Sequence, residues 1–162
     1  MIRGLHHNAY RCRDSEETRK FYEDFLGLRL VNAFEINETK TGRQTHVLHA
    51  FYAMDDGSCL AFFEAPDLPF EFKAQHDYDL HIALEVPHAA LQPALDKGRT
   101  AGIESRGIVD HDGIHSIYFR DPNGYVIELT AKSPHHDDYM DPVKNGARER
   151  LARWQHAKVA RA

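Results

Sequence analysis

The chain has 162 residues, of which 42% are hydrophobic, so it can bury the core of one domain or of two joined modules. Its formal net charge of -5 and its lack of any lysine- or arginine-rich run argue against nucleic acid or a membrane surface as partner. A small molecule fits better. Because no apolar signal segment follows Met1 and no run reaches the roughly 18 apolar residues of a membrane span, we expect a cytoplasmic protein.

The first half of the chain predicts a strand, a helix and three more strands. Residues 5–12 alternate as a strand that carries His7. Asp14 forms a capping box with Glu17 and opens a helix that Gly27 ends. The further strands are predicted over residues 28–36, 45–53 and 59–64. Cysteines at positions 12 and 59 form no Cys-x-x-Cys pair, and we expect both to be reduced.

The second half repeats this order. It predicts a strand over residues 80–86, a helical segment over 87–101 and a strand over 103–108. Pro93 lies inside the helical segment, so we expect a kink or a late helix start. Two apolar runs then flank Asp121-Pro122-Asn123-Gly124, which suits the tight turn of a β-hairpin. A final helix is expected after Asp141, with Leu151 and Trp154 packed on the domain or on a second subunit.

Histidines and acidic residues recur in matching places in the two halves. The first strand of each half carries a histidine, His7 or His81, and the last strand carries an acid, Glu64 or Glu128. A buried carboxylate is costly unless it is paired or binds a metal. If the two halves fold alike, these four side chains converge. Two imidazoles with one or two carboxylates suit Zn, Fe, Ni or Mn, and a two-histidine, one-carboxylate face suits Fe(II). Taken singly, each of these residues is more often structural or solvated, and only the matched set of four favours a metal.

We therefore predict an α+β fold of two βαβββ modules that form a curved eight-stranded mixed sheet around a metal site, plus a C-terminal helix. The predicted domain covers residues 1–133, with module one over 4–65, a connector over 66–79 and module two over 80–131. A polar extension that contains the helix covers residues 134–162.

Three stretches of the chain resemble the vicinal oxygen chelate superfamily: GLHHNAYRCRDSEETRKFYEDFLGLRLV, DLHIALEV and SIYFRDPNGYVIEL. This superfamily includes glyoxalase I, extradiol dioxygenases, fosfomycin-resistance enzymes, methylmalonyl-CoA epimerase and drug-sequestering bleomycin-resistance proteins. The resemblance implies that His7, His81 and Glu128 are metal ligands. Glu64 falls near the fourth position that glyoxalase I uses, so it is either a fourth ligand or a carboxylate of the pocket. The superfamily usually forms homodimers.

The number of ligands separates the candidate reactions. Three protein ligands leave three sites of a six-coordinate ion for a catecholate and O2, whereas four leave two sites for an enediolate. Tyr118 matches a tyrosine of extradiol dioxygenases, and His111 or His115 is a candidate general acid or base. The favoured prediction is an extradiol-type dioxygenase that uses Fe(II) and O2 on a catechol-like aromatic diol.

Two other functions stay open at this point. One is a glyoxalase-like lyase, isomerase or epimerase that uses Zn, Ni, Co or Mn on an α-oxo compound. The other is a protein that sequesters a drug without a metal.

Overall fold

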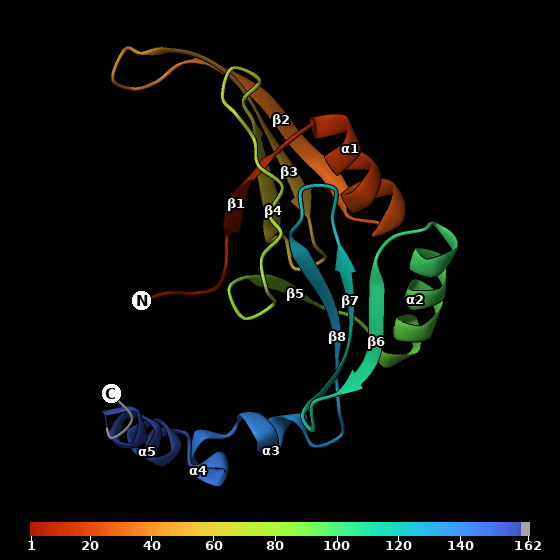
Figure 1. Ribbon diagram of the computed structural model, residues 1–162, viewed down its shortest axis with the longest axis vertical. Coiled ribbons are helices and arrows are strands. Elements are labelled where there is room, and N and C mark those ends of the chain that lie inside the picture. The colour runs from red at the N-terminus through yellow and green to blue at the C-terminus, as the bar shows by residue number, and fades with distance from the viewer. Residues whose placement is uncertain (160–162) are drawn as a thin grey trace. The chain divides into compact units, whose positions relative to one another are not determined.

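The computed structural model describes residues 1–159, which form two compact units. The first unit combines Met1–Ile82 with Arg120–Val126, and the second combines Ala83–Phe119 with the chain from Ile127 onward (Figure 1). The predicted α+β fold with two βαβββ modules is confirmed, and its eight strands form two four-stranded sheets. The predicted boundaries of the domain and its extension stay predictions.

The elements follow the predicted order closely. Module one contains β1 (His7–Cys12), α1 (Ser15–Arg19), the π-helical turn η1 (Lys20–Phe25), β2 (Arg29–Glu38), β3 (Gln44–Ala53) and β4 (Cys59–Glu64). Module two contains β5 (His81–Glu85), the 3-10 turn η2 (His88–Ala90), α2 (Leu91–Thr100), β6 (Ser105–Asp110), β7 (Ile114–Arg120) and β8 (Val126–Lys132). The chain continues through α3 (His136–Met140), α4 (Pro142–Asn145) and α5 (Ala147–Val159).

The first sheet has the strand order β1-β4-β3-β2, and its two faces have different roles. Alternation along β1 puts His7 and Arg11 on one face and Cys12 on the other. The helix covers the face of Cys12, where the ring of Tyr22 lies 4.6 Å from the ring of Phe62. Both rings are almost fully buried, and burying a ring of this size contributes about 1.5–3 kcal/mol. This packing leaves the face of His7 without a helix of its own module.

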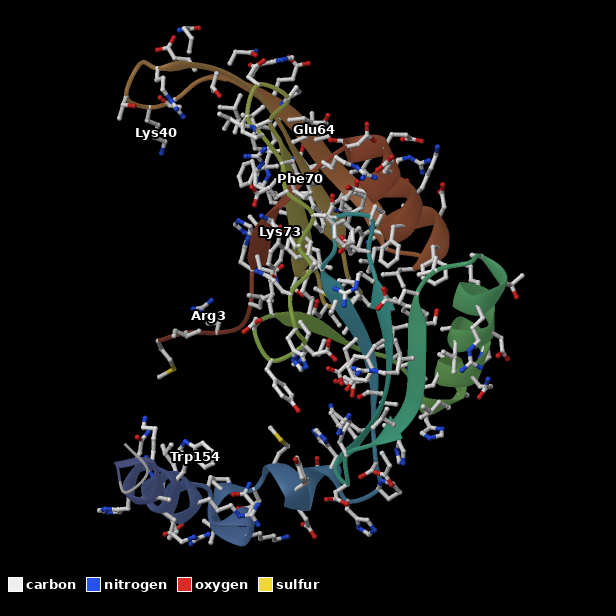
Figure 2. All side chains as sticks on the ribbon, viewed as in Figure 1. Arg3, Lys40, Glu64, Phe70, Lys73 and Trp154 are labelled. Carbon is white, nitrogen blue, oxygen red and sulfur yellow. The ribbon has the colours of Figure 1, made fainter. Side chains whose placement is uncertain are left out.

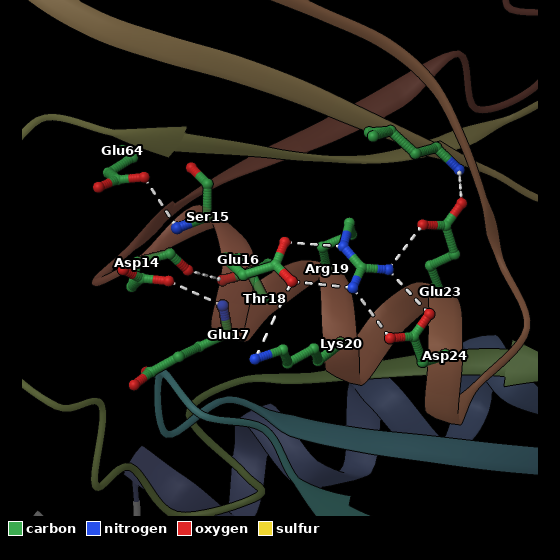
Figure 3. A network of polar contacts seen from close by, with 11 residues as sticks. Asp14, Ser15, Glu16, Glu17, Thr18, Arg19, Lys20, Glu23, Asp24 and Glu64 are labelled. Carbon is green, nitrogen blue, oxygen red and sulfur yellow. Dashed lines mark hydrogen bonds and ion pairs between the residues drawn. The ribbon is translucent and has the colours of Figure 1, made fainter.

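The first helix begins as predicted, since the Asp14 carboxylate accepts a hydrogen bond of 2.8 Å from the backbone N–H of Glu17. It differs from a regular helix in its second half, where the N–H of Leu26 donates to the carbonyl of Phe21 five residues earlier. Arg19 binds acidic side chains on both sides of this point, including Asp24 five residues later, at 2.8 Å (Figure 3). The wider π turn brings that carboxylate to the same side as Arg19.

The second sheet has the order β5-β8-β7-β6, and α2 packs against Phe119 of β7. A Cβ atom on Gly98 would lie 2.4 Å from the ring of Phe119, so only glycine lets α2 come this close. Pro93 lies in the first turn of α2, where its missing N–H costs no intrahelical bond, and the α-helix starts at Leu91. The predicted late start is therefore confirmed.

The predicted hairpin turn between β7 and β8 is also confirmed, and it is anchored in the first unit. The backbone N–H of Asp121 donates to the carbonyl of Tyr125 at 2.9 Å, and Gly124 takes a positive φ of 93°. The hydroxyl of Tyr22 donates to the buried carboxylate of Asp121 at 2.9 Å. Burial raises the pKa of this carboxyl group, while its hydrogen bonds act in the opposite direction.

The C-terminal helix forms, but the expected packing of its apolar residues on the domain is wrong. Leu151 and Trp154 are both 61% exposed on α5, and Figure 2 labels Trp154 on this helix. Packing on a second subunit remains a proposal. The last part of the predicted extension, residues 160–162, lies outside the described residues. No helix formed by residues 1–159 is long and apolar enough to span a membrane.

Candidate functional site

His7 is the first residue of β1 and projects from the face of the first sheet that no helix of its module covers. Its Nδ1 atom lies 2.8 Å from Nδ1 of His6, so one of the two nitrogens carries the shared proton. This contact occupies Nδ1 of His7. In the tautomer in which Nδ1 of His7 is the donor, Nε2 has the lone pair that can bind a metal ion.

His49 of β3 is a second histidine on this face, and the sequence did not predict it as a residue of the site. Its ring lies 6.5 Å from the ring of His7 and stacks on Phe63 at 3.7 Å. The Nδ1 atom of His49 is 3.1 Å from the carbonyl oxygen of Phe62. Because a carbonyl only accepts, Nδ1 carries the proton and Nε2 is an acceptor in the neutral ring. Burial, together with the nearby His7, lowers the pKa of His49 and favours this neutral form.

Aromatic side chains surround these two histidines. The ring of Phe51 lies 5.4 Å from that of His7, and Phe34 stacks on Phe51 at 6.1 Å. Phe34 is 43% exposed, so the aromatic group reaches the surface of the unit. We call Phe34, His49, Phe51 and Phe63 the aromatic cluster.

Glu64 lies on the opposite face of the same sheet from His7. It pairs with Cys12 in the register of β1 and β4, and its Oε2 atom accepts a hydrogen bond of 2.8 Å from the N–H of Ser15 (Figure 3). The carboxylate therefore caps the start of α1 and is not brought together with His7. On the His7 face β4 carries Cys59, Ala61 and Phe63, none of which is a carboxylate.

In the second unit, three of the predicted residues form a hydrogen-bonded chain. The hydroxyl of Tyr118 donates to Oε1 of Glu128 at 3.2 Å, and Nε2 of His111 lies 2.8 Å from the same hydroxyl. Glu128 is only 4% exposed although it lies within β8. Burial and the charge of Glu128 raise the pKa of Tyr118, which keeps the phenol protonated.

The other candidate acid or base, His115, lies away from this chain. His115 and Tyr118 are three residues apart on β7, so they project from opposite faces. Its Nε2 atom is 3.7 Å from the carboxylate of Asp110, and its ring is 5.1 Å from that of His88. Of the two histidines, only His111 is brought to Tyr118.

His81 is the first residue of β5, just as His7 is the first residue of β1. Its Nδ1 atom lies 2.8 Å from the carbonyl oxygen of Asp77. Nδ1 therefore carries the proton, and Nε2 has the lone pair that a metal ion binds. Metal-binding histidines commonly hold a carbonyl or carboxylate through the other ring nitrogen in this way.

Residues 1–159 contain no preformed group of three His, Cys, Asp or Glu side chains placed to hold a metal ion. Of the predicted ligands, His7, His81 and Glu64 belong to the first unit and Glu128 to the second. What the structure does assemble is the chain of His111, Tyr118 and Glu128 in one unit, and His7 with the aromatic cluster in the other.

Repeated βαβββ modules with a histidine at the start of each define the vicinal oxygen chelate fold. The chain belongs to the Glyoxalase/Bleomycin resistance protein/Dioxygenase superfamily, whose sequence model matches residues 4–129. A comparison with curated protein sequences finds no match.

Solved structures of the same fold are similar to this chain. A glyoxalase/dioxygenase from Nostoc punctiforme is 23% identical, with a TM-score of 0.62 over 81% of this chain and 92% of its own. The fosfomycin resistance protein FosX from Mesorhizobium loti is also 23% identical, with a TM-score of 0.62 over 85% and 98%. A mutant of FosX from Listeria monocytogenes, solved with Mn(II) and 1S,2S-dihydroxypropylphosphonic acid, is 20% identical, with a TM-score of 0.60 over 85% and 98%.

Proposed function

We propose that this protein is an extradiol-type dioxygenase that uses Fe(II) and O2 to open the ring of a catechol-like aromatic diol. The observation that carries the proposal is the hydrogen-bonded chain from Glu128 through Tyr118 to His111. It places the protonated phenol of Tyr118 and the imidazole of His111 next to the buried carboxylate of Glu128. Carboxylates of this kind bind metal ions in proteins. Such a chain can move a proton at a substrate hydroxyl.

The proposed ligands are His7, His81 and Glu128. Each histidine opens the first strand of its module, and Glu128 is the third residue of β8. The third residue of β4, the equivalent position in module one, is Ala61, which has no ligand atom. Glu64 instead holds the N–H of Ser15. We therefore propose three ligands, which leave three positions of a six-coordinate ion open.

These donors fit the proposed ion. Two imidazoles and one carboxylate form the set that suits non-haem Fe(II). When bound, the ion supplies chelation of both diol oxygens and electron transfer from the diol to O2. Both oxygen atoms of O2 enter the ring-opened product, so no further reductant is needed.

The residues around the ligands handle substrate and protons. Tyr118 donates its proton to Glu128, so Nε2 of His111 is the donor to the phenol oxygen and can pass its proton to Tyr118 when Tyr118 gives up its own. Neutral His49 presents Nε2 as an acceptor for a diol hydroxyl, because Nδ1 is fixed on Phe62. The aromatic cluster around His7 offers stacking surfaces, which favours an aromatic ring over a small α-oxo compound.

We propose that the active protein is a homodimer whose two copies share the ligand set. His7 belongs to module one and Glu128 to module two, so module one of one copy can complete module two of the other. Exposed apolar side chains on β2, Leu30 and Val31, are suitable for such a contact, because exposed apolar surface favours association.

Metal analysis combined with an oxygen assay tests the proposal. Protein purified without oxygen and loaded with Fe(II) is mixed with 4-ethylcatechol in an oxygen electrode, while the absorbance of the ring-opened product is followed. We expect one O2 consumed per diol and a yellow product. If the protein loaded with zinc, nickel, cobalt or manganese converts an α-oxo substrate without taking up O2, the result would support the lyase or epimerase instead. If the protein binds a drug without a metal, the result would support sequestration.

The histidine assignment has a matched pair of variants. His111→Ala removes the ring that contacts Tyr118, whereas His115→Ala removes a ring on the other face of β7. We expect a large loss of kcat only in His111→Ala. Equal losses in the two variants would contradict the assignment.

A further inference from the structure

His111 lies in the short loop of residues 111–113 that joins β6 to β7. Within this loop the N–H of Gly113 donates to the carbonyl of His111 at 2.8 Å, and the N–H of His111 donates to the carbonyl of Ile114 at 2.9 Å. Asp112 at the tip has a positive φ of 63°, a conformation that few residues other than glycine adopt. Both His111 and Asp112 are exposed. Because exposed loops move more than the strands that they join, the place of His111 depends on what holds the loop.

The chain just after β8 holds this loop at Gly113, which is buried. The backbone N–H of Ser133 donates to the carbonyl of Gly113 at 3.0 Å, and Nδ1 of His136 lies 3.2 Å from the same oxygen. Since a carbonyl only accepts, Nδ1 of His136 carries the proton. A Cβ atom on Gly113 would lie 2.4 Å from the ring of Tyr139, so this ring packs directly on the backbone of the loop.

Tyr139 is itself held in place by the helices around it. It lies in α3, where its N–H donates to the carbonyl of His135 at 2.9 Å. Its own carbonyl accepts a hydrogen bond of 2.8 Å from Nδ2 of Asn145, just after α4 begins. An ion pair between Lys144 and Asp138 also joins α4 to α3. The ring on Gly113 is therefore part of a braced structure.

The loop connects this contact to the proposed proton chain. His111 is two residues before Gly113, and its Nε2 atom lies 2.8 Å from the hydroxyl of Tyr118. Hydrogen bonds of this kind need a distance of about 2.7–3.2 Å, so a small shift of the loop would separate His111 from Tyr118. The residues that hold Gly113 follow the part of the chain, residues 4–129, that the family model matches.

We propose that Tyr139 and His136 are positioning residues, which hold the loop of residues 111–113 so that His111 reaches Tyr118. This inference rests on the proposed function, in which His111 passes a proton to Tyr118. Tyr139 and His136 act through His111 and not on the substrate. The segment after β8 then supports the reaction, although it lies outside the part that the superfamily shares.

Two alanine variants of neighbouring α3 residues test the inference. Tyr139→Ala removes the ring on Gly113, and Met140→Ala, the matched control, removes a side chain that is 61% exposed. O2 uptake with 4-ethylcatechol is measured on the Fe(II)-loaded proteins, with the iron content determined in parallel. We expect Tyr139→Ala to lose about 10- to 100-fold in kcat, because a small misplacement of a reacting group can cost this much, with KM and iron content unchanged. Met140→Ala should match the wild type, and Tyr139→Phe, which keeps the ring, should retain most of kcat.

A double variant separates the positioning of His111 from a general structural role. If Tyr139 acts through His111, adding Tyr139→Ala to His111→Ala causes no further loss in kcat, because the group that it positions is already gone. A further loss as large as that in the wild-type background would overturn the inference. A kcat of Tyr139→Ala within threefold of the wild type would also overturn it. If Tyr139→Ala does not fold, His136→Ala gives the same comparison, since it removes a single hydrogen bond to the loop.

Hydrogen exchange tests the inference without any turnover. The exchange of the peptide that covers residues 110–116 is followed by mass spectrometry in the wild type, Tyr139→Ala and Met140→Ala. We expect faster exchange only in Tyr139→Ala, because the amides of His111 and Gly113 bond within the loop that the ring holds. Equal exchange in all three proteins would overturn the inference. The failure of the dioxygenase proposal is distinct: the wild type then consumes no O2 with 4-ethylcatechol, while the exchange rates still report on the loop.

Discussion

Replacing Tyr118 by phenylalanine isolates the one hydroxyl that links Glu128 to His111. The variant keeps the ring, which lies 4.4 Å beneath the guanidinium carbon of Arg106, and loses the contacts at 3.2 Å and 2.8 Å. The net loss of stability should be about 1–3 kcal/mol, because two hydrogen bonds are lost at about 0.5–1.5 kcal/mol each. The loss in kcat should be much larger, about 100- to 10,000-fold, because the hydroxyl takes part in proton transfer.

The assay is steady-state O2 uptake on Fe(II)-loaded protein at saturating diol, with the iron content of each sample measured in parallel. Tyr118→Phe and His111→Ala should reduce kcat in a non-additive way, since both break the same chain. A loss in kcat below threefold in Tyr118→Phe, at unchanged iron content, would refute the proton-transfer role. A loss that follows the iron content would show that Tyr118 only supports the ligand Glu128.

Three further predictions concern the pKa shifts and the assembly. Burial raises the pKa of Asp121 in the folded protein, so the folded state binds a proton more tightly than the unfolded chain. The stability that Asp121 contributes is complete at pH values below the unfolded pKa and is lost as pH rises through the folded pKa. Urea titrations should therefore show that the free energy of unfolding of the wild type increases relative to that of Asp121→Asn as pH falls from 7 to 3.5. Burial raises the pKa of the Cys12 thiol to about 11, so a thiol reagent at pH 8 should modify Cys59 in the native protein and Cys12 only after unfolding. A mixture of His7→Ala and Glu128→Ala chains, refolded together, should regain activity, because one shared site of each mixed dimer keeps all its ligands.

Each of these predictions can fail clearly. A stability difference between wild type and Asp121→Asn that is independent of pH would contradict the raised pKa. Fast modification of Cys12 in the native protein would contradict its burial, which leaves 1% of the residue exposed. Mixed chains as inactive as either variant alone would mean that each chain completes its own site.

Local sequence patterns predicted the elements well, because capping and turn residues act over a few positions. Asp14 caps its helix and Asp121 to Gly124 form the hairpin turn, as expected. The repeat of a strand histidine followed by a helix was sufficient to predict two similar modules. The apolar residues of α5 gave a weaker signal, since helical spacing cannot say whether Leu151 and Trp154 meet a partner.

Pairing across strands was harder to predict, and it decides the site. Glu64 and Glu128 both follow an apolar run, but Glu64 is the sixth residue of β4 whereas Glu128 is the third of β8. An odd difference in position along a strand reverses the face. Alternation along β7 likewise puts His115 and Tyr118 on opposite faces, because they are three residues apart. This separation follows from the sequence once the strand is assigned. His49, however, becomes visible as a neighbour of His7 only through the register of β3 with β4 and β1.

The iron content of ligand variants tests the central claim most directly. Wild type, His7→Ala, His81→Ala, Glu128→Gln and Glu64→Gln are loaded with Fe(II) without oxygen, desalted and analysed for bound iron. We predict about one iron per chain in the wild type and in Glu64→Gln, and a large loss in the other three. Full iron in the three ligand variants, or a loss in Glu64→Gln equal to theirs, would contradict the three-ligand site.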